Sequence, residues 1–559
     1  MSMLLTRWFV LLGLLVSLSL QAAPKQYALA VPDQFAADVA EHVFADGGNA
    51  IDAAIAVGFS LAVTLPEAGN LGGGGFMLVY YDGQPYFIDY REMAPRAAYP
   101  DMYLNENGNV VGLPSLVGHR AAGVPGTVMG LWEAHQRFAK LPWQRLVAPS
   151  IALARDGFVV PEPLAKHIKD DLDFFAPTNF ADYFAAVKGG ERFVQQELAA
   201  TLARISEQGI DDFYRGETAQ FIVASMQAND GLITLEDLAA YRAIWRQPIR
   251  ARWRDKELLT APLPSSGGIA LTSLLSMRDL LAAHFDGVTH NSAQYVHLLA
   301  EMEKRVYADR GEYLGDGDFV DVPVASLLDP AYIAKRAAAV NPKAISETEK
   351  VQPGLYESPQ TTHYSIVDAD GNAVSNTYTL NLSFGSGAVV EGAGFLLNNE
   401  MDDFSIKPGL PNAYGVIGGR ANEIQPGKRM LSSMTPTIVL SGEGRVDMVT
   451  GSPGGSTIIT TVMQSILNNY DFHMTAPDIA AAERVHHQLY PKNVITYHPS
   501  LTEAVANELR QMGYTVEKHP WTMGDLQVLV RMADGHWSAG SDPRGRGAAV
   551  VGDILSSQP

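Results

Sequence analysis

One threonine of this sequence stands where a nucleophile could be exposed at the start of a strand. Residues 345–360 are polar and include Pro353, Gly354 and Pro359, which is typical of an exposed, irregular segment. Strand-like residues begin directly after it, at Thr361, with the motif TTHYS. A threonine hydroxyl can be the nucleophile of covalent catalysis. Threonine is also a common strand residue, so this motif alone leaves a structural role open.

A hairpin would place a second threonine opposite the first. Two strand-like segments, residues 361–367 and 373–383, flank an Asp-Ala-Asp-Gly-Asn turn signal that begins at Asp368. If Asp368 faces Asn372, the numbers of paired residues sum to 368 + 372 = 740. Thr361 then faces Thr379, within about two residues of register error. Thr379 and Asn381 should share one face of the strand, because side chains alternate with a period of two.

A pair of glycines could stabilise negative charge near such a nucleophile. Gly454 and Gly455 precede an apolar segment of helical character at residues 458–468. Backbone N–H groups at a helix start can bind an anion, and an oxyanion hole for acyl transfer uses the same geometry. The lysine of a nucleotide-binding P-loop is absent, which argues against a nucleoside triphosphate site. A tight turn that caps the helix remains an equal alternative.

Several other residues could bind the charged ends of a substrate. Arg91 ends a strand-like segment, where a guanidinium can hold a carboxylate through two hydrogen bonds. Ser432 and Ser433 offer two hydroxyls between apolar residues. For Arg91, an ordinary exposed surface arginine is the default interpretation.

A dense polar cluster lies at residues 398–403 and includes Glu400 and Asp403. Taken alone, it favours a solvated loop or calcium ligands over catalysis. The Pro- and Gly-rich residues 407–419, with Tyr414 near the middle, are typical of a flexible loop that covers a site.

Composition excludes several classes of protein. The chain has 559 residues, of which 47% are hydrophobic, too many for an intrinsically disordered protein. Its formal charge of −20 argues against nucleic-acid binding, because phosphates would be repelled. The absence of cysteine excludes disulfides, zinc–thiolate sites and a thiol nucleophile. His486 and His487 would point to opposite faces of a strand, and no metal-ligand spacing occurs elsewhere, so we expect neither metal nor cofactor.

The first residues predict export. Arg7 precedes an uncharged, mostly apolar run at residues 8–20, and small residues follow at Ala22 and Ala23. This is the pattern of a secretory signal peptide, which we place at residues 1–22. A membrane anchor is the alternative, but a spanning helix needs about 20 apolar residues. We therefore expect secretion across the inner membrane, with the periplasm as the location.

Helical and strand-like segments interleave along the whole chain. We expect a buried helix at residues 51–63 behind an Asn49 cap, a helical region at residues 126–243 and a helix at residues 295–310. Further strands are expected, among them 394–397. Length alone would suggest three or four domains, whereas the interleaving indicates a layered α/β or α+β architecture.

Together, these segments resemble the gamma-glutamyltranspeptidase family of N-terminal-nucleophile hydrolases over essentially the whole mature chain. The resemblance rests on segments in the family's order, among them GGNAIDAAIAV, GNLGGGGFM, DYREMAP, PLPSSGG, TTHYSIVDADGNAV, LLNNEMDDF, KRMLSSM, TGSPGGS and SDPRG. It implies an α+β fold, a four-layer αββα sandwich that two chains form jointly after the precursor cleaves itself.

The resemblance places that cleavage between Gln360 and Thr361. Residues 23–360 would form a large subunit and residues 361–559 a small, catalytic subunit. The Thr361 hydroxyl would attack the preceding carbonyl, and water would release the resulting ester. The new α-amine, with an unperturbed pKa of about 7.7–8.0, would then be the base for the same hydroxyl.

The resemblance also implies a role for each candidate residue. Thr379 would orient Thr361, and Gly454 and Gly455 would form the oxyanion hole. Arg91, Ser432 and Ser433 would bind the substrate α-carboxylate. Asn381, Glu400 and Asp403 would bind the α-ammonium, and Tyr414 would cover the site. The donor would be a γ-glutamyl compound such as glutathione, and the acyl-enzyme would be resolved by water or by an amino acid or peptide amine.

Two other functions are compatible with parts of this pattern. A related acylase for cephalosporin or glutaryl side chains would share the fold and the nucleophile but would need no α-ammonium site. The intact LLNNEMDDF segment argues against it. A non-catalytic exported binding protein would be expected to lack Thr361, Thr379 or the glycine pair, and all of these are present.

Overall fold

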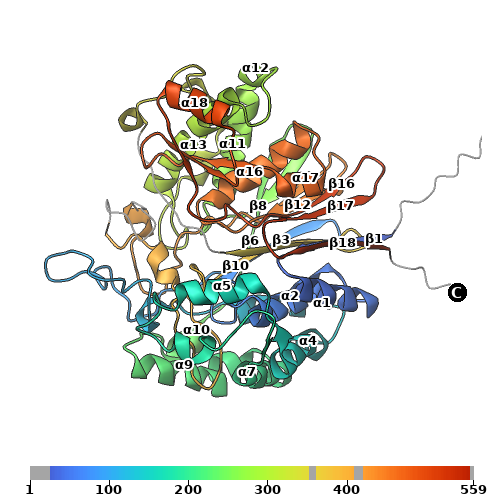
Figure 1. Cartoon of the computed structure of the whole chain (residues 1–559), viewed down its shortest axis with the longest axis vertical. Helices are drawn as coiled ribbons and strands as arrows, with labels where there is room; N and C mark the ends of the chain where they lie inside the picture. The colour runs from blue at the N-terminus through green and yellow to red at the C-terminus, as the bar shows by residue number, and fades with distance from the viewer. Residues whose placement is uncertain (1–24, 352–360, 408–418, 554–559) are drawn as a thin grey trace, which may run out of the picture.

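The computed structural model describes residues 25–351, 361–407 and 419–553. Two antiparallel sheets lie face to face at its centre, and helices cover the outer face of each sheet (Figure 1). This is the four-layer αββα sandwich expected of the fold. The predicted signal peptide at residues 1–22, Gln360 and Tyr414 lie outside the described residues.

Seven strands form the first sheet, in the order β18-β1-β9-β10-β2-β3-β6. Their bounds are β1 Gln26–Val31, β2 Gly74–Tyr81, β3 Gln84–Tyr90, β6 Ile244–Arg246, β9 Thr362–Val367, β10 Ala373–Thr379 and β18 Ala548–Asp553. Strands from both ends of the chain alternate, since β9 and β10 lie between β1 on one side and β2 on the other. The strands before residue 360 therefore cannot separate from those after it without breaking hydrogen bonds of this sheet.

Six strands form the second sheet, in the order β17-β16-β12-β11-β8-β7. Their bounds are β7 Ile249–Trp253, β8 Lys256–Thr260, β11 Thr437–Leu440, β12 Val446–Gly451, β16 Gln527–Arg531 and β17 Trp537–Ser541. Apolar side chains from both sheets meet in one buried layer, for example Phe76 and Leu78 of β2 with Ile438 of β11 and Val449 of β12. Burial of such side chains contributes about 1.5–3 kcal/mol each, so this layer holds the sheets together.

Helices complete the outer layers. The first sheet is covered by α1 Gln34–Ala45, α2 Ala50–Thr64, α3 Thr127–Phe138, α4 Trp143–Asp156, α5 Glu162–Asp171, α6 Phe180–Phe184, α7 Gln196–Gln208, α8 Ile210–Arg215, α9 Glu217–Ala228 and α10 Leu235–Ala240. The second is covered by α11 Gly267–Leu280, α12 Ala282–Phe285, α13 Ala293–Tyr313, α14 Val324–Leu327, α15 Pro330–Ala338, α16 Thr457–Tyr470, α17 Ala476–Ala481 and α18 Glu503–Met512. Two small sheets, β4 Phe158–Val159 with β5 Arg192–Phe193 and β13 Arg484–His486 with β14 Val494–His498 and β15 Thr515–Lys518, lie outside these layers.

The expected helix at residues 51–63 is confirmed as α2. Its Asn49 side chain accepts from the backbone N–H groups of Ile51 and Asp52, and Asp52 accepts in return from the Asn49 N–H. Every residue of the helix is buried, which agrees with its nearly uniform apolar composition. Within the described ranges, no helix combines the length and the apolar character needed to cross a membrane.

Two details of the sequence-based prediction are wrong. Residues 394–397 form no strand; Leu396 and Leu397 make only isolated bridges, to Val389 and to Gly72. The second strand of the predicted hairpin ends at Thr379 rather than continuing to residue 383. The cause lies in the turn beyond it, where Asn381 and Phe384 have φ values of +76° and +59°.

Helix α13 carries unusual buried charge. Glu303 is 1% exposed, one of its carboxylate oxygens accepts from the His487 N–H at 2.9 Å, and the other has no hydrogen-bond partner. Burial raises the pKa of Glu303 to about 8. An acid whose pKa is raised on folding loses its stabilising contribution as pH rises from the unfolded value of about 4.3 towards the folded value.

Glu303→Gln is therefore expected to raise the melting temperature at pH 8–9. The amide keeps an acceptor for His487 and carries no charge to desolvate. The gain should shrink towards pH 5, where the carboxyl group is already protonated in the folded protein. Thermal unfolding of both proteins across this pH range is the measurement. An equal shift at every pH would contradict the assignment.

Candidate active site

The register of the hairpin is the one that the arithmetic predicts. Strands β9 and β10 pair so that residue numbers sum to 740, and the last pair of the ladder is Thr362 with Tyr378. The same register carries Thr361 to a position opposite Thr379. Thr361 is 9% exposed and Thr379 2%, so both hydroxyls lie at a nearly buried end of the first sheet.

A glycine-rich segment fixes the backbone of Thr379. Gly74 of β2 pairs with Thr379, and the Asn70 side chain donates to the Thr379 carbonyl at 2.9 Å. A Cβ atom on Gly73 would lie 1.9 Å from that carbonyl oxygen, so only glycine fits there. Thr127 donates to the Asn70 carboxamide at 2.7 Å and holds it in place.

Asn381 does not share the face of Thr379. It lies beyond the strand, in the left-handed region, so the alternation by two does not apply to it. Its backbone N–H donates to the Thr379 hydroxyl oxygen at 2.7 Å, and its side-chain amide donates to the Asn399 carbonyl at 3.0 Å. Because Thr379 accepts in the first bond, its own O–H must be directed at a different acceptor.

The glycine pair forms a sharp turn between β12 and α16. Gly454 and Gly455 have φ values of +131° and +57°, which other residues adopt only with strain. The Thr457 and Ile458 N–H groups donate to the carbonyls of Gly454 and Gly455, both at 3.1 Å. The two glycine carbonyls thus accept hydrogen bonds from the first turn of α16. This arrangement is suited to presenting backbone N–H groups to an anion.

Arg91 is the centre of a buried charge cluster. It follows the end of β3, is 1% exposed, and donates to both Glu400 and Asp403. Its Nε also donates to the Met430 carbonyl at 3.3 Å. The resemblance placed Arg91 and the two acids at opposite ends of a substrate, whereas here they are direct partners. Burial explains the pairing, because an uncompensated buried charge costs several kcal/mol.

Three carboxyl groups share this guanidinium. Glu92 is fully buried, lies 3.7 Å from Arg91 and has no hydrogen-bond partner for either oxygen. Burial raises the pKa of Glu92 to about 7 and raises that of Glu400 well above its usual range. Burial also raises the pKa of Asp403, while the positive charge of Arg91 acts in the opposite direction. Burial thus opposes the ionised form of all three carboxyl groups, while the positive charge of Arg91 favours it.

Ser432 and Ser433 lie beside this cluster. Both are buried, at 2% and 3% exposure, and Leu431 directly before them contributes a carbonyl that accepts from Arg91 at 3.4 Å. The Ser432 N–H donates to the Pro264 carbonyl at 2.9 Å, which ties this loop to the PLPSSGG segment.

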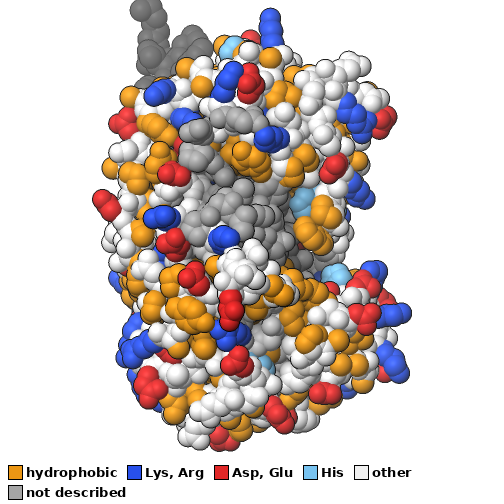
Figure 2. Space-filling view, turned by 90° about the vertical axis from the view of Figure 1, so that its left-hand side faces the viewer, with side chains coloured by type: hydrophobic (Ala, Val, Ile, Leu, Met, Phe, Trp, Pro, Cys, Tyr) orange, Lys and Arg blue, Asp and Glu red, His pale blue; other side chains and the backbone are white. Residues whose placement is uncertain are grey.

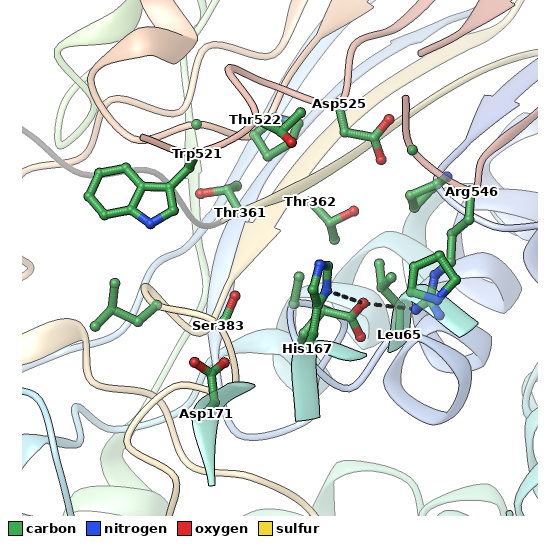
Figure 3. A pocket seen from close by; sticks show the side chains of 18 of the residues that line it. Leu65, His167, Asp171, Thr361, Thr362, Ser383, Trp521, Thr522, Asp525 and Arg546 are labelled. Carbon is green, nitrogen blue, oxygen red and sulfur yellow. Dashed lines mark hydrogen bonds and ion pairs between the residues drawn. The ribbon is translucent and has the colours of Figure 1, made fainter. Parts of the chain in front are cut away.

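A cavity of about 690 Å³ opens next to the threonines (Figure 3). Its wall includes Thr361 and Gly454, and on the opposite side His167 and Asp171 of α5. None of the six residues expected to bind the donor's charged ends contributes to it. The candidate nucleophile thus lines an open cavity to which the buried charge cluster does not contribute. On the face of the molecule shown in Figure 2, Lys, Arg, Asp and Glu side chains are interspersed with hydrophobic ones.

A family model for gamma-glutamyltranspeptidase matches residues 36–552. The chain belongs to the gamma-glutamyltranspeptidase family. A glutathione hydrolase proenzyme of Pseudomonas aeruginosa is 58% identical over 527 residues, with 94% of each chain covered. Among solved structures, the gamma-glutamyltranspeptidase of Pseudomonas nitroreducens in complex with L-DON is 59% identical, with a TM-score of 0.58, 58% of this chain and 97% of that chain covered. A cephalosporin acylase of Bacillus halodurans is 26% identical with a TM-score of 0.83, and 94% and 96% of the two chains are covered.

As a gamma-glutamyltranspeptidase, the chain has polar residues around its site that its motifs did not single out. Asn70 lies in the GNLGGGG segment, Ser266 in PLPSSGG, and Arg310 on α13, where the periodicity indicated only a core helix. For Asn70 and Ser266, the position within a family segment was the available signal, whereas Arg310 lies in none of those segments. Among the described residues, no group of three or more His, Asp and Glu side chains is placed to hold a metal ion.

Proposed function

We propose that this chain is an exported, self-cleaving γ-glutamyltransferase and glutathione hydrolase, with Thr361 as its nucleophile. The observation that carries the proposal is the place of Thr361, opposite Thr379 at the end of β9 and on the wall of the same cavity as Gly454. Family membership supplies the class of reaction. The signal-peptide pattern at residues 1–22 supports export to the periplasm.

Cleavage would begin with attack of the Thr361 hydroxyl on the carbonyl of Gln360. A bond forms between the Thr361 Oγ1 and the carbonyl carbon of Gln360 as the peptide C–N bond breaks. The released amine of Thr361 takes up the hydroxyl proton. Water then hydrolyses the ester, which leaves a carboxylate on residue 360 and a free α-amine on Thr361. That amine can accept the hydroxyl proton in each later turnover. Thr379 would orient the hydroxyl throughout.

The charge cluster fits the α-carbon of a γ-glutamyl donor. Its carboxylate would bind Arg91 with Ser432 and Ser433, and its ammonium would bind Glu400 and Asp403 with Asn381. A zwitterion inserted between Arg91 and the two acids would exchange their direct contacts for a carboxylate–guanidinium pair and an ammonium–carboxylate pair, so each charge of the ligand would have a partner. The γ-carbonyl would then point towards Thr361, and Gly454 and Gly455 would stabilise the oxyanion.

The cavity fits the group on the other side of the scissile bond. Its 690 Å³ lies within the usual range of about 300–1,000 Å³ for small-molecule sites. The leaving amine of glutathione would depart through it, and water or an acceptor amine would enter by the same route to resolve the acyl-enzyme.

The relatives support formation of two subunits. The Pseudomonas aeruginosa relative is named a proenzyme. The solved chain from Pseudomonas nitroreducens matches over 97% of its own length, yet it covers only 58% of this chain. A large subunit of residues 23–360 and a small one of residues 361–559 would agree with that share. The buried acids beside Arg91 favour a donor with an α-ammonium over a cephalosporin or glutaryl side chain.

Product analysis tests the donor assignment. Purified protein is expected to release the anilide from a γ-glutamyl anilide, and glycylglycine should divert part of the glutamate into γ-glutamyl-glycylglycine. Glutarylanilide, which lacks the α-ammonium, serves as the matched control and should react poorly. Release from glutarylanilide but not from the γ-glutamyl compound would favour the acylase function instead.

A further inference from the structure

Helix α13 places a buried guanidinium directly behind the serine pair. Arg310 is 2% exposed, and its Nη2 donates to the Ser433 hydroxyl oxygen at 3.2 Å. Its Nε donates to the Ser266 hydroxyl oxygen at 2.8 Å. Ser266 in turn donates through its hydroxyl to the Ser432 carbonyl at 2.7 Å. One side chain is therefore linked to both serines, directly to Ser433 and through Ser266 to Ser432.

The direction of these hydrogen bonds matters for chemistry. A guanidinium can only donate, so the Ser433 oxygen accepts from Arg310 and the hydroxyl proton of Ser433 must be directed elsewhere. A carboxylate can only accept. Because Ser433 accepts from Arg310, its hydroxyl group is oriented to donate to a carboxylate. Through Ser266, Arg310 also helps to hold the backbone of Ser432.

The charge of Arg310 acts in the same sense. Burial lowers the pKa of Arg310 to about 10, so the guanidinium remains charged at neutral pH. The positive charge also reaches Asp403, where it acts to lower the pKa of the carboxyl group. A second cation near Arg91 offsets part of the repulsion that a substrate carboxylate would meet from Glu400, Asp403 and Glu92.

We propose that Arg310 is a positioning residue for the donor's α-carboxylate, acting through Ser433 and the Ser266 relay. The inference rests on the proposed function, since it assumes a donor with an α-carboxylate at Arg91. Arg310 would act through the serines and not by contact with the substrate. It would belong to the large subunit, whereas Ser433 would belong to the small subunit. This role also explains why the long helix α13 buries an arginine at this position.

The same helix offers a contrast one turn earlier. The Tyr307 hydroxyl donates to the Ser456 carbonyl at 2.5 Å, directly behind the Gly454–Gly455 turn. Tyr307 therefore supports the Gly454–Gly455 turn, not the loop that carries Ser432 and Ser433. Loss of Tyr307 should lower kcat, whereas loss of Arg310 should raise KM.

The experiment compares two donors in Arg310→Gln and Arg310→Lys. One donor is the γ-glutamyl anilide, and the other is the same anilide with hydrogen in place of the α-carboxylate. Arg310→Gln is expected to raise KM for the first donor about 10- to 100-fold and to change the second little, as for loss of a charge-assisted hydrogen bond. Arg310→Lys should recover part of the preference for the carboxylate. Tyr307→Phe should leave that preference unchanged.

A double-mutant cycle with Ser433→Ala tests the route. If Arg310 acts through Ser433, Arg310→Gln should raise KM clearly less in the Ser433→Ala background than in the wild type, because only the Ser266 relay and the charge of Arg310 then remain to be lost. Arg305→Gln is the matched control, because Arg305 is a buried arginine on the same helix and binds Glu301 and Ser346, outside the site. It should leave the preference for the carboxylate intact.

Three results would overturn the inference. Equal losses for both donors would make Arg310 a general structural residue, and independent effects in the cycle would remove the route through Ser433. Failure of both Arg310 variants to fold and cleave, while Arg305→Gln does so, would make it a folding residue. These are distinct from failure of the proposed function, which would appear as wild-type protein that releases no anilide from the γ-glutamyl donor.

Discussion

Thr361→Ala is expected to leave the chain uncut between residues 360 and 361 and to abolish release of the anilide from a γ-glutamyl donor. The alanine methyl group cannot attack the preceding carbonyl, so neither the ester nor the new α-amine forms. A denaturing gel shows the result as a single band. Wild-type protein should instead give a small chain of 559 − 360 = 199 residues.

Two neighbouring changes make this test specific. Thr361→Ser keeps the hydroxyl and should retain cleavage, at a reduced rate because the methyl group that restrains the rotamer is lost. Thr362→Ala removes a hydroxyl on the same cavity wall, one residue away, and should cleave normally. Complete cleavage of Thr361→Ala would show that the chain is cut by another residue or another protein.

Arg91→Lys should lower kcat/KM for γ-glutamyl donors about 100- to 1,000-fold. Lysine keeps the charge but loses the planar fork, so it cannot bind Glu400 and Asp403 at once or hold a carboxylate through two hydrogen bonds. Most of the loss should appear in KM, because the contact exists before and during the reaction.

A matched arginine separates this effect from general destabilisation. Arg254→Lys changes another forked contact, to Asp279, at the surface rather than in the site. It should leave kcat/KM within about 2-fold of the wild type, as is usual for a surface pair. A similar loss in both variants, or an unchanged KM in Arg91→Lys, would contradict the role of Arg91 in donor binding.

Local signals predicted the parts of the site that depend on neighbours in the sequence. The turn from Asp368 to Asn372 fixes the register of β9 and β10 through local hydrogen bonds, so the meeting of Thr361 with Thr379 follows from the sequence alone. The glycine pair before α16 is local in the same sense. The family resemblance supplied the roles, which no pattern of spacing contains.

Contacts across the chain could not be predicted in this way. Arg91 and Glu400 are 309 residues apart, and only the packing of β3 against the loop after residue 398 makes them partners. Asn381 was misplaced because a strand was assumed to continue, whereas the tertiary position of Asn399 draws its side chain out of the sheet. Arg310 was not singled out because in the sequence it is one more charged residue of a long helix, and only the fold brings it to Ser266 and Ser433.

The alternation of strands in the first sheet has a consequence for how the enzyme is made and lost. Folding of the precursor is a reaction of one molecule, whatever its concentration, since β1, β9, β10 and β2 belong to one chain. If the chain is cleaved after residue 360 as proposed, the same ladder would join two molecules, and rebuilding it after denaturation would depend on their encounter. Dilution would then oppose recovery, and the covalent link needed for the first assembly would no longer exist. The active form would be reached once and kept by slow unfolding rather than by reversible folding.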